Sequence, residues 1–129
     1  MKEPRWVTRR IINDFHQHQL HAHGGIEGIR DENLLESALA RPQQKYAYEP
    51  DADLFDLGAA YAFGIARNHP FLDGNKRSAF GAMGAFLLGN GYLLEVEEAD
   101  AISTMQRIAA GNMAETELAA WARRNSEPI

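Results

Sequence analysis

Apolar residues recur every three or four positions through most of the chain, which is the spacing of helices that bury one face. Six such stretches stand out, at about 8–21, 32–41, from 53 towards Pro70, at about 75–88, near 97–110 and at 114–124. Alternating runs of β-branched residues are nearly absent, and valine occurs only at positions 7 and 96. The pattern predicts an all-α fold, a compact bundle of about six helices within a single domain, 1–129.

The ends of these stretches carry the residues that begin and end helices. Asp31 is a typical N-cap for the second helix, and Asn90 with Gly91 is a good left-handed end for the fourth. Pro42 disfavours continuation of the second helix, so we expect a short flap hairpin or loop at 42–51. The third stretch is rich in glycine and alanine, which predicts a central helix packed on every side.

Composition excludes several classes of protein. The 129 residues are 45% hydrophobic, carry a net charge of −5 and contain no cysteine. The acidic balance argues against direct nucleic-acid binding, and the lack of cysteine excludes disulfides and thiolate metal sites. No apolar run reaches the roughly eighteen residues needed to span a bilayer, and the N-terminus does not resemble a signal peptide. We therefore expect a cytoplasmic protein without a membrane partner.

Residues 69–77 bring several chemical groups together in one short connection, His-Pro-Phe-Leu-Asp-Gly-Asn-Lys-Arg. Gly74 permits a tight turn, after which a new helix begins with free backbone amides near Asn75 and Lys76. Such amides at the positive end of a helix form an anion cradle. Lys76 adds a cation, and Arg77 can grip a phosphate with two parallel hydrogen bonds.

Two further residues of this stretch complete the parts of a phosphoryl-type transfer. Asp73 is a hard oxygen ligand suited to Mg²⁺ that is shared with phosphates, and His69 supplies a base. Each residue alone has an ordinary structural interpretation, as a helix cap, a turn or a solvated charge. Their conjunction within nine residues favours chemistry, with Phe71 and Leu72 expected in the core.

The nine residues closely resemble the signature of Fic-domain proteins, in the form found in death-on-curing (Doc) toxins of bacterial toxin–antitoxin pairs. The similarity covers most of the chain, roughly residues 5 to 125, and is clearest within 28–42, 53–69 and 90–92. The resemblance implies a catalytic set of His69, Asp73 and Arg77, with ATP and Mg²⁺ as cofactors. It also implies a nucleotide-binding set, which comprises Gly74, Asn75, Lys76, Arg77 and, just upstream, Arg67.

The resemblance also implies a flap that aligns the target polypeptide by main-chain pairing. In this chain the flap would fall on the expected loop at 42–51, with Tyr46, Ala47 and Tyr48 as contacts. The two tyrosines have an equally good interpretation as cover for the core.

Two positions separate this chain from the Fic proteins that transfer AMP. Lys76 stands where those enzymes have glycine, and Phe80 stands where they have a second arginine. Both residues are features of Doc. Doc resembles an enzyme that binds ATP in the opposite orientation to the AMP-transferring enzymes and transfers its γ-phosphate. The implied function is phosphorylation of a Ser or Thr hydroxyl on a translation protein, elongation factor Tu. AMP transfer, or a degenerate Fic fold that only binds, remain the alternatives.

Many Fic proteins carry an inhibitory helix with a short motif. The motif is Ser or Thr, then any three residues, then Glu followed by Gly or Asn. Glu27 and Glu32 are the only glutamates with such a neighbour, and both lack the hydroxyl residue. The resemblance therefore implies a separate antitoxin whose C-terminal segment docks in a groove. Trp6, Ile11 and Phe15 are candidates for the docking patch, with core packing as the competing interpretation.

Four histidines, at 16, 18, 21 and 23, fall on two faces of the first helix and do not converge. We expect them at a solvated helix end and not in a zinc site.

Overall fold

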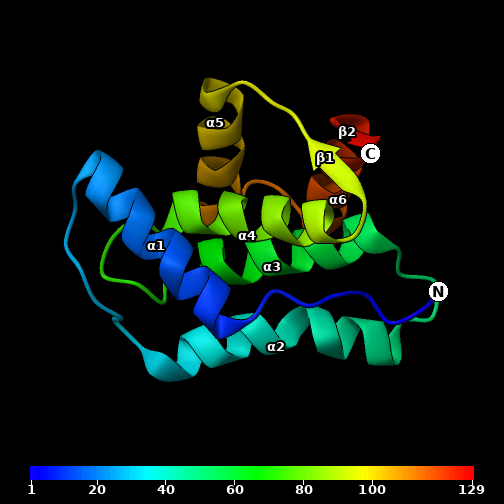
Figure 1. Cartoon of the computed structure of the whole chain (residues 1–129), viewed down its shortest axis with the longest axis horizontal. Helices are drawn as coiled ribbons and strands as arrows, with labels where there is room; N and C mark the ends of the chain where they lie inside the picture. Colours follow the sequence, from blue (N-terminus) through cyan, green and yellow to red (C-terminus); the bar gives the residue numbers. More distant parts are fainter.

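The computed structural model describes all 129 residues as a helical bundle with one very small sheet (Figure 1). Its elements follow one another in the order α1 (Arg9–His23), α2 (Glu32–Tyr48), α3 (Leu54–Asn68), α4 (Asn75–Gly89), β1 (Tyr92–Leu94), α5 (Glu98–Ala109), α6 (Glu115–Arg124) and β2 (Ser126–Pro128). The six helices lie close to the six stretches of helical spacing, so the predicted fold class is confirmed.

α3 is the central helix, as its small residues predict. It packs against α2, α4, α5 and α6, and Figure 1 shows it running through the middle of the molecule. Gly64 allows α2 to approach closely, because a Cβ at Gly64 would lie only 3.2 Å from the Ala38 Cα. The buried faces of α3 and α4 therefore form the core on which both ends of the connection between them rest.

Side-chain caps begin the first three helices. The Thr8 hydroxyl accepts the Ile11 amide, and the Asp31 carboxylate accepts the Leu34 amide. Asp53 caps α3 and accepts the Asp56 amide at 2.9 Å, while the Asp56 side chain accepts the Asp53 amide. These bonds satisfy amides that have no partner inside the helix, and they confirm the starts expected from the sequence.

The predicted end of α2 at Pro42 is wrong. The helix continues through Pro42 to Tyr48, so no flap hairpin or loop occupies 42–48. A proline inside a helix costs one backbone hydrogen bond, but its ring here is buried against the core. The next turn gains contacts that offset this cost: Lys45 pairs with Glu115 at 3.3 Å, and Tyr46 packs edge-on against Trp6.

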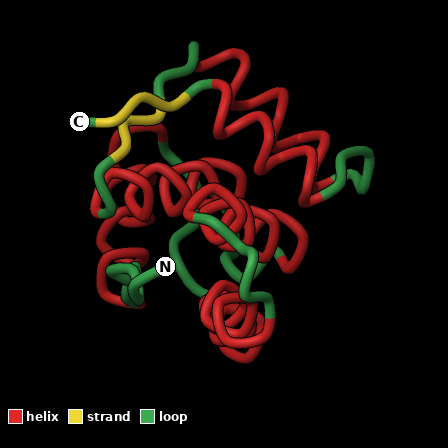
Figure 2. The backbone as a smooth tube through the Cα atoms, turned by 90° about the vertical axis from the view of Figure 1, so that its right-hand side faces the viewer, coloured by secondary structure: helices red, strands yellow, loops and turns green.

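The extended segment after α4 is half of a two-stranded sheet. β1 pairs antiparallel with β2, with Leu93 opposite Glu127, and Figure 2 shows the pair beside the C-terminus. β2 has no signal in the sequence, because its Ser-Glu-Pro lacks any strand pattern. None of the helices combines the length and the apolar character that a membrane crossing requires.

Candidate active site

The connection between α3 and α4 leaves one helix and enters the next through two left-handed residues. His69 ends α3 with φ 50°, and Gly74 precedes α4 with φ 77°. A hollow of about 280 Å³ opens over this connection and is lined by His69, Leu72, Asp73, Gly74, Asn75, Lys76 and Arg77. The structure thus brings six residues of the predicted site, all but Arg67 and the flap, to one cavity.

The N-terminus of α4 carries no side-chain cap. Its first backbone bond runs from the Ser78 amide to the Gly74 carbonyl, so the amides of Asn75, Lys76 and Arg77 have no partner within the chain. These amides lie at the positive end of the helix dipole and can receive an anion. Lys76 has no ion-pair partner, and Arg77 has only Glu98, 3.7 Å away on α5.

Asn75 closes the connection from the inside. Its Oδ1 accepts the Phe71 amide at 2.9 Å, and its Nδ2 donates to the Phe71 carbonyl at 3.0 Å. The same Nδ2 lies 3.3 Å from His69 Nδ1. The backbone amide of Asn75 therefore faces the cradle, while its side chain holds the connection in shape.

His69 lies at the edge of the cavity in an environment that favours the neutral imidazole. Partial burial lowers the pKa of His69, and the nearby cations of Lys76 and Arg30 lower it further. The Asn75 amide nitrogen lies 3.3 Å from Nδ1 and so holds one side of the ring, and which ring nitrogen carries the proton depends on the tautomer. His69 is thus suited to accept a proton at neutral pH.

The Asp73 carboxylate is exposed beside the cradle and held by backbone groups. Its Oδ1 accepts the Gly74 amide at 2.9 Å, and its Oδ2 accepts the Ile26 amide at 3.2 Å. Gly25 permits this approach, because a Cβ there would lie 2.9 Å from Oδ2. No cluster of three or more metal-ligating side chains exists in the chain. This lone carboxylate fits Mg²⁺ that takes its other ligands from water and phosphates.

His16 supports the same connection from α1, and its expected place at a solvated helix end is wrong. The side chain is buried, its ring stacks on Phe71 at 3.8 Å, and Nε2 lies 2.8 Å from the Asp73 carbonyl. A carbonyl only accepts, so Nε2 carries the proton. Phe71 is in the core as predicted, but Leu72 is 51% exposed, because it follows the turn outward over Gly28.

Arg30 is a residue that the sequence analysis missed. Its Nε donates to the His69 carbonyl at 2.7 Å, and its Nη2 donates to the Asn68 carbonyl at 2.8 Å. Its segment, 24–31, runs antiparallel to the connection, with Ile29 opposite Phe71. Arg30 therefore fixes the end of α3 that carries His69. Its only signal in the sequence is its place just before the Asp31 cap.

Arg67 and the expected flap residues lie outside the cavity. The Arg67 guanidinium lies 5.8 Å from the Phe63 ring centre, and a Cβ at Gly111 would lie 2.8 Å from its Nη1. Tyr46, Ala47 and Tyr48 belong to the last turn of α2. α2 continues past Pro42 and leaves no loop there, and the segment that pairs with the connection is 24–31.

The candidate docking patch is not continuous. Trp6 stacks on Phe86 and packs against the core, as the competing interpretation has it. Phe15 lies against Gly81, where any Cβ would come within 2.1 Å of the Phe15 ring. Of the three residues only Ile11 is largely exposed.

Comparison with known proteins adds to this geometry. Residues 6–87 match the family model described as "Fic/DOC family". Over 87 residues the chain is 34% identical to "Protein kinase doc" of Escherichia phage P1, a match that covers 67% of this chain and 69% of that protein. It is 43% identical over 77 residues to "Toxin Doc" of Mycolicibacterium smegmatis, which covers 59% of each. The family match runs from Trp6 to Leu87, near the end of α4, and so includes every residue that lines the cavity. This chain therefore belongs to the Fic/Doc family.

Proposed function

We propose that the chain is the toxin of a toxin–antitoxin pair. In this proposal it transfers the γ-phosphoryl group of ATP, with Mg²⁺, to a Ser or Thr hydroxyl of a translation protein. The observation that carries the proposal is the single cavity in which uncapped amides, Arg77, Asp73 and a neutral imidazole converge. The names of the two relatives, a protein kinase and a toxin, support it.

His69 is proposed to take the proton of the incoming hydroxyl. The target oxygen bonds to the γ-phosphorus, the bond from that phosphorus to the β,γ-bridging oxygen breaks, and ADP leaves. The lowered pKa of His69 supports this role, since a neutral imidazole is the form that accepts a proton. Asn75 and Arg30 hold the ring and its backbone in place.

Asp73 is proposed to hold Mg²⁺ together with the nucleotide phosphates. The ion would neutralise charge on the phosphates. The two backbone amides that bind the carboxylate fix its position beside the cradle, which supports this assignment. Amides 75–77, with Lys76 and Arg77, are proposed to bind the transferred phosphate and its neighbour.

AMP transfer is the alternative reaction. The same cradle permits it, because the α-phosphate of ATP could occupy the cradle as well as the γ-phosphate. Lys76 and Phe80 favour γ-transfer, since they stand where the AMP-transferring relatives have glycine and a second arginine. By the resemblance, the proposed target is elongation factor Tu. Its backbone would align along 26–29, where the Glu27 and Ile29 amides have no partner within the chain.

Labelled ATP tests the reaction directly. The purified chain is incubated with Mg²⁺, purified elongation factor Tu and ATP labelled at either the γ- or the α-phosphate. We expect the γ-label on the target; the α-label would establish AMP transfer. His69→Ala should lower the rate by about 10²–10⁴-fold and remove growth inhibition on expression. His21→Ala, an exposed histidine on α1, is the matched control. ATP binding without transfer to any translation protein would reject the proposal.

The proposed partner is an antitoxin that blocks this site. Its C-terminal segment would dock as a helix with an apolar strip. If the adjacent reading frame encodes it, co-expression should restore growth and yield a stable complex with the chain. A chain that remains toxic beside that product would contradict this pairing.

A further inference from the structure

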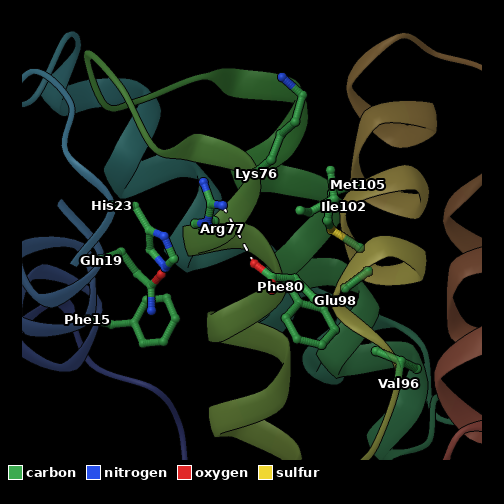
Figure 3. A pocket seen from close by; sticks show the side chains of 11 residues that line it. Phe15, Gln19, His23, Lys76, Arg77, Phe80, Val96, Glu98, Ile102 and Met105 are labelled. Atoms are coloured by element: carbon green, nitrogen blue, oxygen red, sulfur yellow. Dashed lines mark ion pairs between the residues drawn. The ribbon is translucent and has the colours of Figure 1, made fainter.

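Two further hollows differ in their relation to the active-site cavity. The larger one, of about 350 Å³ between α1, α4 and α5, contains Lys76 and Arg77, and Figure 3 shows Arg77 beside Glu98 there. Both cations also line the active-site cavity, so this hollow is continuous with the site already described. The smaller one lies between α2 and α3 and contains Arg41 and Arg67. It shares no residue with the cavity or with the larger hollow.

This α2–α3 hollow is small and mainly polar. Its volume is about 110 Å³, and two of its eight lining residues are hydrophobic. The eight residues are Ser37, Ala38, Arg41, Gln44, Phe63, Gly64, Arg67 and Asn68. Pockets for drug-sized ligands enclose roughly 300–1,000 Å³, so the hollow is too small for a nucleotide and suits a single small ion or group.

The shape of the hollow follows from the packing of α2 on α3. A Cβ at Gly64 would lie 3.2 Å from the Ala38 Cα, so small residues let the two helices meet at the floor. Ser37, Arg41 and Gln44 are spaced four and three residues apart on α2, which places them on one face of that helix. The rim therefore carries hydrogen-bonding side chains above a floor of small residues.

Two guanidinium groups share one half-buried aromatic ring in this hollow. The Arg41 Cζ lies 4.9 Å from the Phe63 ring centre, and the Arg67 Cζ lies 5.8 Å from it. Attraction between a cation and the face of the ring favours both positions. Because the two arginines come from different helices, their N–H groups can approach one anion from two directions.

Most donors of these two arginines have no acceptor in the protein. Arg67 lies against Phe63 and the turn at Gly111, and it forms no ion pair or hydrogen bond within the chain. Arg41 donates from Nε and Nη2 to Glu115, which leaves its Nη1 without a partner. No acidic residue lines the hollow itself. The hollow therefore keeps a net positive charge in a chain whose total charge is −5.

This set of donors matches a tetrahedral anion with several oxygens. The Arg67 guanidinium can donate two parallel hydrogen bonds, and the Arg41 Nη1 can donate another. The Ser37 hydroxyl and the Gln44 amide add two more donors on the same rim. A carboxylate has only two oxygens in one plane and would leave part of this set unused, so a phosphate group fits the hollow better.

We propose that the α2–α3 hollow binds a phosphate group, held by Arg67 and Arg41 beside the Phe63 ring. The site is separate from the phosphate cradle of α4, and it does not depend on the proposed function. Inorganic phosphate and a phosphate monoester both carry the required group. Arg67, which the resemblance places among the nucleotide-binding residues, thereby serves a different anion.

Titration of the ¹⁵N-labelled chain with inorganic phosphate tests the proposal by NMR, without Mg²⁺ and at constant ionic strength. The Arg67 Nε–H and the Gly111 amide report on the hollow, and the amides of 75–77 report on the α4 cradle. We expect the Arg67 signal to shift along a saturating curve. Gly74→Asp, which places a carboxylate at the cradle, should leave that curve unchanged.

Arg67→Gln removes the cation without breaking an ion pair or hydrogen bond inside the chain. We expect the phosphate concentration that half-saturates the Gly111 shift to rise about tenfold or more. Arg67→Lys keeps the charge but loses the planar fork, and should give a smaller rise. Arg124→Gln alters an exposed arginine in the last turn of α6 and is the matched control, which should bind like the unaltered chain.

Two further probes, O-phosphoserine and acetate, complete the test. Whichever of inorganic phosphate and O-phosphoserine binds more tightly at the Gly111 amide identifies the source of the phosphate group, and both results support the site. An Arg67 signal that does not shift, or that shifts without saturating, would overturn it. An unchanged curve in Arg67→Gln, or acetate that binds as tightly as phosphate, would overturn it too.

Discussion

α3 and α4 are neighbouring helices of equal length whose N-termini differ in what binds their first amides. At α3, Asp53 and Asp56 form a reciprocal pair of bonds between side chains and amides. At α4, Gly74 takes the N-cap position and supplies no side chain. The first amides of α3 are therefore bound by side chains of the protein, whereas those of α4 have no side-chain partner, which is what the proposed phosphate site requires. A helix start without a cap, placed beside a histidine and an aspartate, is the more informative of the two.

The largest expected effect comes from giving α4 the kind of cap that α3 has. Gly74→Asp would place a carboxylate where it can accept a cradle amide and repel a phosphate. Aspartate tolerates the left-handed conformation at this position better than most residues. We expect the affinity for ATP and for tripolyphosphate to fall by at least about tenfold in calorimetry. Gly89→Asp, at the open far end of α4, should leave both affinities unchanged; full binding by Gly74→Asp would contradict the cradle.

A second prediction concerns the support of the α4 end by His16. His16→Ala removes the stack on Phe71 and the bond to the Asp73 carbonyl, so the Asp73 loop loses its fixed position. We expect about a tenfold rise in the Mg²⁺ concentration at half-maximal ATP binding. His16→Gln retains a donor and should recover part of the loss. A purely structural role would instead lower the melting temperature of both variants equally and leave the Mg²⁺ dependence unchanged.

The cap of α3 should matter for stability alone. Asp53→Ala removes the bond to the Asp56 amide and the ion pair with Arg123, and should lower the free energy of unfolding by about 0.5–2 kcal/mol. Urea denaturation measures this change, with Asp51→Ala, an exposed neighbour, as the control. Nucleotide affinity should be the same in all three proteins. A loss of affinity in Asp53→Ala would mean that the two helix starts are not independent.

The smallest effect concerns pH. The pKa of His69 lies below the ordinary value of 6.5, chiefly through burial and then through Lys76 and Arg30. A base acts when deprotonated, so kcat/KM should rise with pH through that lowered pKa and level off above it. Lys76→Met removes one cation, which raises the pKa of His69 and shifts this rise to higher pH. Lys2→Met should leave the profile in place, and a shift to lower pH in Lys76→Met would contradict the electrostatic cause.

Local sequence signals predicted most of the fold. Asp31 and Asp53 begin their helices as expected, because a cap depends on residues within one turn. The prediction that α2 ends at Pro42 was wrong because the end of this helix also depends on distant contacts. The contacts of Lys45 with Glu115 and of Tyr46 with Trp6 join residues far apart in sequence, and no local pattern reveals them.

The candidate site likewise has a part that the local sequence predicts and a part that depends on distant residues. The stretch 69–77 is contiguous, and all of its residues except Pro70 and Phe71 line one cavity. His16 and Arg30 reach that cavity from other elements, and a run of polar residues gives no sign that one of them is buried. Arg67 shows the converse: it is close to His69 in sequence, but α3 directs its side chain towards Phe63.

The bond from the Ile26 amide to the Asp73 carboxylate joins two parts of the protein that would serve different ligands. A cation drawn to Asp73 changes the charge on the oxygen that holds Ile26, and a polypeptide laid along 26–29 changes the position of that amide. In the proposed function both ligands bind here, and thermodynamic linkage then requires that any change one makes to the affinity of the other is returned by the same factor. The effect of Mg²⁺ on target affinity, once measured, would therefore also give the effect of the target on Mg²⁺ affinity.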